Sequence, residues 1–191
     1  MMLLPATTGG KARSTRILCV NNLKQIGRAE NVWAGDHGDK YSFQVAETNG
    51  GTMSFITGPN AWRHFQILSN EVFTPGVLIC PADDLHTVAA TNFNSFNNSN
   101  LSYFIGLDAI NADPQSVLSG DCNITNGTPI KNELLELTTN RPAGWTADTH
   151  KQVGNIALSD GSVQQVSITG LRMGLLNAGV STNHFQMPVF P

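Results

Sequence analysis

The chain has 191 residues, of which only 13% are charged, and its formal net charge is −3. A chain of this length can bury one good core, and its weakly acidic balance argues against nucleic acid as a partner of the main body. Low charge with many small polar residues is typical of exported β-rich proteins. The first apolar run, residues 1–5, is far shorter than the roughly 20 residues that cross a bilayer.

The first predicted element is a helix over residues 11–34, which contain no proline and a single glycine. At 100° per residue, one arc of roughly 120° collects five apolar side chains: Cys19, Leu23, Ile26, Ala29 and Trp33. The glycine-containing segment 35–38 then favours helix termination. Taken alone, this pattern fits an ordinary surface helix packed on a domain.

The charge of this helix differs from that of the rest of the chain. The first 28 residues hold five basic side chains and no acid, net +5, so the remaining six basic and fourteen acidic side chains give −8. A basic leading helix on an acidic body indicates an arm that faces something different from what the body faces. We therefore divide the chain into residues 1–10, a helix over 11–35 and a β-rich head over 36–191.

Most of the head is predicted to form strands. Short apolar or alternating runs predict strands at 41–45, 77–80, 101–107 and around 117–118. The strongest hairpin signal spans residues 153–168, where Asp160-Gly161 separates two β-rich runs.

Helical segments are expected at 61–68, 132–137 and 170–176, and the C-terminal tail is expected to be turn-like. There are no internal repeats, and no linker is long enough to separate two large domains. One long helix followed mainly by strands predicts an α+β fold, with an antiparallel sheet and long loops.

The three cysteines, Cys19, Cys80 and Cys122, show no CxxC spacing and no His/Cys cluster, which argues against a structural zinc site. One disulfide with one spare thiol fits an oxidising compartment, and three buried thiols fit a reducing one. Cys19 lies on the inward arc of the helix and Cys80 ends an apolar run, so we favour them as a pair if a disulfide forms.

Four acids could supply oxygen ligands for calcium, which takes six to eight of them: Asp36, Asp39, Asp83 and Asp84. A solvated loop explains these residues better, because their spacing is only loosely like that of a calcium loop. No cofactor is therefore assigned, and calcium is retained only as an alternative.

His150 and Asp160 could suggest a metal site or a catalytic pair. An extended strand between them separates the two by roughly 25–30 Å, so we expect Asp160 to form a turn and His150 to cap or pack at the start of the strand. The Ser159-Asp160 and Ser119-Gly120-Asp121 segments lack the strand-turn-helix elbow of a nucleophilic serine. The sequence therefore predicts no enzyme.

Four segments together resemble a known family: residues 19–27, 102–109, 114–121, and His150 followed after nine residues by Asp160-Gly161. In this order they resemble the type II secretion pseudopilin-like proteins of Verrucomicrobia and Planctomycetes, whose C-terminal signature is His-x9-Asp-Gly. The resemblance implies a long N-terminal helix packed on an antiparallel sheet. It also implies that residues 1–10 are the remnant of a membrane-anchor segment or are disordered, because residues 7–10, Thr-Thr-Gly-Gly, form a poor helix.

The resemblance further implies a structural subunit of a type II secretion pseudopilus or type IV-like filament, in the cell envelope or outside the cell. Its partners are then other pseudopilin subunits, the secretion machinery and, through a missing N-terminal segment, the inner membrane. The helix face with Cys19, Leu23, Ile26 and Trp33 is the expected assembly element.

The main alternative is a soluble envelope or extracellular module that binds a ligand such as a glycan through the loops of the same fold. Self-association through the first helix would favour the filament subunit. Affinity of the head for a small ligand, without self-association, would favour the binding module.

Overall fold

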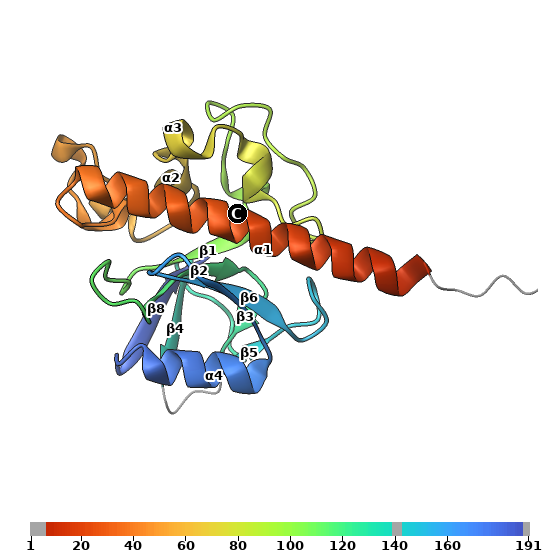
Figure 1. Ribbon diagram of the computed structural model, residues 1–191. Coiled ribbons are helices and arrows are strands. Elements are labelled where there is room, and N and C mark those ends of the chain that lie inside the picture. The colour runs from red at the N-terminus through yellow and green to blue at the C-terminus, as the bar shows by residue number, and fades with distance from the viewer. Residues whose placement is uncertain (1–6, 139–142, 189–191) are drawn as a thin grey trace, which may run out of the picture.

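The computed structural model describes residues 7–138 and 143–188, with side chains described from Arg13 onward. The chain begins with a long helix, α1 (Thr7–Asp36), and the described strands form a six-stranded antiparallel sheet in the order β4-β8-β1-β2-β6-β7. Figure 1 shows α1 lying across this sheet and extending past it at its N-terminal end. The predicted α+β class, with a leading helix on an antiparallel sheet, is confirmed.

Every pairing in the sheet is antiparallel. Its strands are β1 (Tyr103–Gly106), β2 (Val117–Asp121), β4 (Leu134–Thr138), β6 (Gly154–Leu158), β7 (Val163–Val166) and β8 (Thr182–Gln186). Two shorter strands, β3 (Ile124–Thr125) and β5 (Gly144–Trp145), pair with each other in a second sheet.

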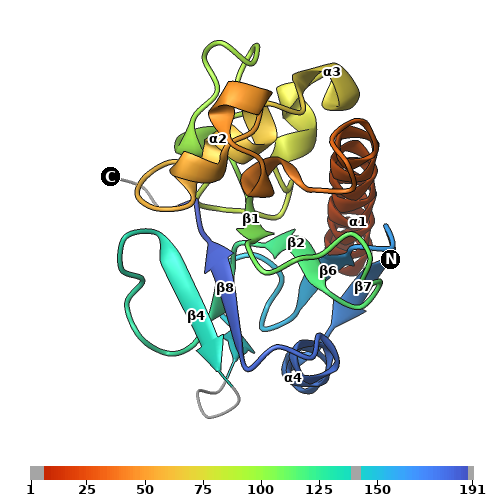
Figure 2. The ribbon, with the colours of Figure 1, turned by 90° about the vertical axis from the view of Figure 1, so that its left-hand side faces the viewer.

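Both faces of the large sheet are covered. One face carries α1 over β2, β6 and β7, and segments of residues 41–101 next to β1 and one end of β8 (Figure 2). The other face carries the helix α4 (Ile168–Asn177) and the β3-β5 pair. Because side chains on both faces are out of water, β1, β2 and β6 are buried at every position.

The inward side of α1 is the arc found in the sequence, whose five side chains are at most 5% exposed. The helix also contacts the β6–β7 hairpin, since Asn31 donates from Nδ2 to the Ser159 carbonyl at 3.0 Å. A Cβ added at Gly27 would lie 3.9 Å from the Cα of Gly161, so helix and turn pass close together. The hairpin turn is therefore part of the surface on which α1 packs.

The predicted start of the first helix at residue 11 is wrong. The helix begins at Thr7 and includes the Thr-Thr-Gly-Gly segment, although glycine is an unfavourable helix residue. A turn added to an existing helix needs no new nucleation, so the rest of α1 can support four weak positions. Residues 1–6, the remainder of the expected anchor remnant, lie outside the described residues.

Two strands predicted before residue 100 are wrong. Residues 41–45 instead contain the short 3₁₀ helix η1 (Ser42–Gln44), and residues 77 and 78 are the end of the 3₁₀ helix η4 (Pro75–Leu78). Their apolar side chains, such as Tyr41 and Leu78, are fully buried, but against α1 and its neighbours and not within a ladder. Apolar runs this short show no period, so the sequence does not distinguish a strand from a buried 3₁₀ helix.

The remaining regular structure of residues 41–101 is also short helices, and residues 79–97 are turns and loop. The predicted helix 61–68 forms α2 (Ala61–Gln66), followed by α3 (Ser69–Val72). Further 3₁₀ turns are η2 (Glu47–Asn49), η3 (Met53–Phe55) and η5 (Asn98–Asn100).

The C-terminal third was predicted in part. The hairpin at Asp160-Gly161 is confirmed: Gly161 has φ +81°, and Asp160 Oδ1 accepts the Ser162 amide at 2.8 Å. The expected helical turn at 132–137 is wrong, because that segment forms β4. The turn-like tail contains β8, which lies between β4 and β1 inside the sheet.

A carboxyl group is buried where α1 meets η1. Glu30 is fully buried, and its Oε1 accepts a hydrogen bond from the Ser42 hydroxyl at 3.2 Å. Burial raises the pKa of Glu30 from 4.5 to about 8, because the charged form loses its hydration. The folded protein therefore holds a proton on Glu30 under conditions in which the unfolded chain has released it.

We predict that replacing Glu30 with Gln stabilises the protein increasingly as pH rises. The stability associated with the protonated carboxyl is complete below pH 4.5 and is lost as pH rises through about 8. Glutamine keeps an acceptor for Ser42 and does not titrate. The stability difference between the variant and the wild type should grow by a few kcal/mol, at about 1.4 kcal/mol per pKa unit.

Urea denaturation of both proteins at pH 4.5, 6 and 8 measures this difference, in which contributions of other titrating groups cancel. The exposed Glu136→Gln serves as the control and should follow the wild type at every pH. Parallel curves for Glu30→Gln and the wild type would show that Glu30 is not held neutral by burial.

Candidate functional site

The four side chains predicted to mediate assembly are not on the surface. Cys19, Leu23 and Ile26 are fully buried, and Trp33 is 5% exposed. All four pack into the core that α1 shares with the sheet. The prediction that these four side chains contact another subunit is therefore wrong. The most apolar side of an amphipathic helix is the side that its own domain buries.

A different set of apolar side chains on α1 faces solvent. Ile17, Leu18 and Val32 are 54%, 47% and 52% exposed. The basic residues Arg13, Lys24 and Arg28 are exposed on the same helix. The part of α1 available to a partner is thus a mixed basic and apolar surface, and the 120° arc in the sequence does not identify it.

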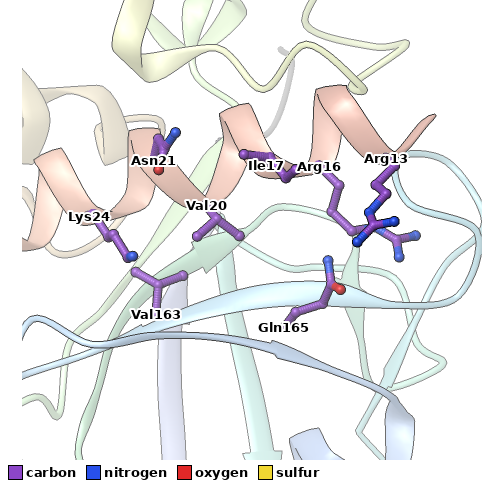
Figure 3. Close-up of a pocket in the computed structure, with 8 residues that line it drawn as sticks. All are labelled: Arg13, Arg16, Ile17, Val20, Asn21, Lys24, Val163 and Gln165. Atoms are coloured by element: carbon purple, nitrogen blue, oxygen red, sulfur yellow. The ribbon is translucent and has the colours of Figure 1, made fainter. Parts of the chain in front are cut away.

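A groove of about 750 Å³ runs between α1 and β7. Figure 3 shows side chains from both elements pointing into it. It is lined by Arg13, Arg16, Ile17, Val20, Asn21, Lys24, Val163 and Gln165, with no acid among them. Because β7 is at the edge of the sheet, one side of its backbone has no neighbouring strand among the described residues. The groove therefore combines positive charge with apolar surface and an open strand edge.

Asp160 and Gly161 lie at the other end of the α1–β7 boundary. A smaller groove of about 440 Å³ is lined there by Lys24, Arg28, Asn31, Val32, Asp160 and Gly161. The Asp160 carboxylate accepts the Ser162 amide, which fixes the turn. These two motif residues hold the hairpin in the shape that α1 contacts.

His150 lies beyond the opposite end of β6 from Asp160. It is 3% exposed, and its Nε2 is 3.3 Å from Asp121 Oδ2 and 3.4 Å from Cys80 Sγ. The His150 carbonyl accepts a hydrogen bond from Arg16 Nη2 at 3.1 Å. His150 therefore connects α1, β2 and the segment around Cys80. The nine residues between His150 and Asp160 are residues 151–153, the strand β6 and the first residue after it.

Burial sets the protonation states of His150 and Asp121. Desolvation lowers the pKa of His150 to about 4 and raises the pKa of Asp121 to about 7. Asp121 Oδ2 also accepts the backbone and side-chain N–H groups of Asn155 at 2.8 and 2.7 Å. The imidazole is thus neutral at pH 7 and acts as a structural connector. The sequence analysis did not identify Asp121 as the partner of His150, or Asn155 as the partner of Asp121, because these contacts join β2 to segments distant in the chain.

A disulfide joins Cys19 of α1 to Cys80, with their Cα atoms 5.2 Å apart, and Cys122 has a free thiol. This is the pair that the sequence analysis favoured. The bond ties the middle of α1 to the end of the 75–80 segment and closes a separation of 61 residues.

The four acids considered for calcium do not converge. Asp39 accepts a hydrogen bond from Asn111, whereas Asp83 is buried against His86 at 2.7 Å. Within residues 13–138 and 143–188, Asp36, Asp39 and Asp84 belong to no group of three or more close potential ligands. The structure therefore gives no support to a calcium site made from these acids.

Comparisons with protein-family models, curated proteins and solved structures find no match to this chain. In the described part of the chain, no helix combines the length and the hydropathy needed to cross a bilayer. The proposals below therefore rest on this chain's own residues.

We predict that breaking the disulfide destabilises the fold by about 4 kcal/mol, the chain-entropy value for a loop of this size. The double variant Cys19→Ser/Cys80→Ser should unfold at lower urea concentration than the wild type. A reductant should lower the wild-type midpoint to that of the variant and leave the variant unchanged. Equal midpoints for the oxidised wild type and the variant would contradict the prediction.

Proposed function

We propose that this chain is a pilin-like structural subunit of an envelope filament, of the type II secretion pseudopilus or a related type IV-like filament. The observation that carries the proposal is the division of α1 into two parts. From Cys19 onward its inward arc is buried in the head, whereas its N-terminal end extends past the head (Figure 1). A filament subunit needs this arrangement, a rod for the centre and a head for the outside.

The exposed side chains of α1 that precede Cys19 support an assembly role. Arg13 and Ser14 are exposed, and Ile17 and Leu18 each leave about half of their surface in water. Burying a side chain such as Ile17 contributes roughly 1.5–3 kcal/mol. Apolar side chains next to basic ones suit a contact that must be both stable and oriented.

Charge provides a second reason for contact between copies. The first 28 residues carry +5 and the remaining residues carry −8, by the residue counts given above. The basic groove between α1 and β7 can therefore attract the acidic head of a neighbouring copy. The same basic residues also suit a surface of anionic lipids at the inner membrane.

The disulfide supports a location in the cell envelope or outside the cell. Structural disulfides persist in oxidising compartments and are rare where thiols are kept reduced. The Cys19–Cys80 bond joins two fully buried residues, so it is a structural part of the core. We accordingly propose the periplasmic face of the inner membrane or the exterior as the site of assembly.

We predict that Ile17→Glu weakens self-association of the purified protein by at least about tenfold, which corresponds to about 1.4 kcal/mol. The substitution places a charge where we expect an apolar contact. Met173→Glu on α4 is the matched control, because Met173 is also 54% exposed but lies on the opposite face of the sheet. Sedimentation equilibrium at low and high salt measures the association constants.

The wild type and Met173→Glu should associate equally, and salt should weaken both. A wild type that stays monomeric at every concentration and salt level would contradict the filament proposal. Equal loss of association in both variants would show that α1 is not the contact. Binding of a glycan by a strictly monomeric protein would favour the soluble binding module instead.

A further inference from the structure

A second cluster of buried titratable side chains lies outside both the groove and the His150–Asp121 pair. Asp83 and His86 stand in the loop that follows Cys80, and Cys122 directly follows β2. Asp83 and His86 are 5% and 3% exposed, and Cys122 is half-buried. One ligand atom from each of the three lies within 4.8 Å of the other two.

The separations between these atoms approach those of a tetrahedral zinc site. Cys122 Sγ is 3.4 Å from Asp83 Oδ2 and 3.9 Å from His86 Nδ1. Zinc bonds of about 2.3 Å to sulfur and about 2.05 Å to nitrogen and oxygen place sulfur about 3.6 Å from either partner. The Asp83–His86 contact of 2.7 Å needs to open by about 0.6 Å to admit the ion.

The second ring nitrogen of His86 is already oriented as a metal ligand requires. His86 Nε2 is 3.3 Å from the Pro188 carbonyl, and Nδ1 faces the Asp83 carboxylate. Both of these partners are acceptors, and a neutral imidazole carries a single N–H. With a metal ion bound at Nδ1, the single N–H of the ring is at Nε2 and can donate to the Pro188 carbonyl. Histidine ligands of metals usually make such a hydrogen bond through their other ring nitrogen.

The loop backbone holds the Asp83 carboxylate in place. Asp83 Oδ1 accepts the backbone N–H groups of Leu85 and His86 at 2.9 and 3.2 Å, and Oδ2 faces the imidazole of His86 and the thiol of Cys122. Asp121 is fully buried next to Cys122 in sequence, and its Oδ1 has no hydrogen-bond partner among the described residues. The carboxylate of Asp83 is therefore fixed beside the thiol of Cys122, and Asp121 precedes Cys122 in the chain.

We propose that Asp83, His86 and Cys122 bind one Zn²⁺ ion, whose fourth position is filled by water or another small ligand. A thiolate, an imidazole and a carboxylate together suit zinc better than calcium or magnesium, which prefer oxygen ligands. Asp84 and Leu85, which lie between Asp83 and His86, are exposed, so the loop has a solvent side from which the ion can enter. Bound zinc ties this loop to the end of β2.

The test is a titration of the oxidised, metal-free, full-length protein with Co²⁺, a spectroscopic substitute for zinc, without reductant. Cys19 and Cys80 are joined in this form, so a thiolate-to-cobalt charge-transfer band must come from Cys122. We expect one cobalt per chain, displacement by Zn²⁺, and slower reaction of Cys122 with a thiol reagent when zinc is present. Cys122→Ser should lose the band.

Asp83→Asn and its neighbour Asp84→Asn form a matched pair that keeps all cysteines. Asp83→Asn should weaken cobalt binding by more than about tenfold, as loss of a ligand does, and Asp84→Asn should leave it unchanged. This comparison holds even if Cys122→Ser fails to fold. The absence of a band in the wild type, a band that survives in folded Cys122→Ser, or equal effects of the two Asp variants would each overturn the proposal.

A second group of potential ligands, Cys19, Cys80 and His150, makes the redox state an essential part of the test. While the disulfide is intact, those two sulfurs are not thiolates and do not bind a metal strongly. A cobalt band that arises only after reduction would assign the metal to that group and overturn the assignment to Cys122.

Discussion

Apolar side chains of α1 lie against the face formed by β2, β6 and β7, where burial removes both surfaces from water at once. Each large side chain contributes roughly 1.5–3 kcal/mol, so this contact is strong enough to fix the position of the helix. The disulfide at Cys19 and the buried Glu30 then lie on the same helix face, next to segments far away in sequence. The region of residues 41–101 has little regular structure of its own and packs against α1 instead.

Several polar groups are buried near the ends of β2 and β6. His150 meets Asp121 where Arg16 of α1 bonds the His150 carbonyl, and Asp83 meets His86 and Cys122 just past the end of β2. Burying such groups is costly unless each has a partner, so they occur as pairs and clusters. In one cluster, Asp121 Oδ2 contacts neutral His150 and accepts the side-chain amide of Asn155. The other contains a free thiol and two acceptor oxygens around one imidazole, which is why we assign a metal to it.

The proposed assembly role and the proposed metal site use different parts of the molecule. Assembly uses the solvent side of α1, with Ile17 and the basic groove along β7. The metal site uses the loop after Cys80 and the residue that follows β2. None of its three proposed ligands lines the groove. Both depend on α1 being docked, since the disulfide positions the Asp83 loop. Their tests are nevertheless independent, because one measures association and the other measures a cobalt spectrum.

The sequence by itself determined the features that are local in the chain. The period of the first helix gave its buried face, and Asp160-Gly161 gave a hairpin, because each signal lies within a few adjacent residues. It did not determine β4, β8 or the fate of residues 41–45, whose structure depends on partners distant in the chain. Nor did it find His86 with Cys122, which are 36 residues apart. Only the tertiary structure decided which side of α1 is free and which polar groups meet, because packing and not sequence proximity sets those distances.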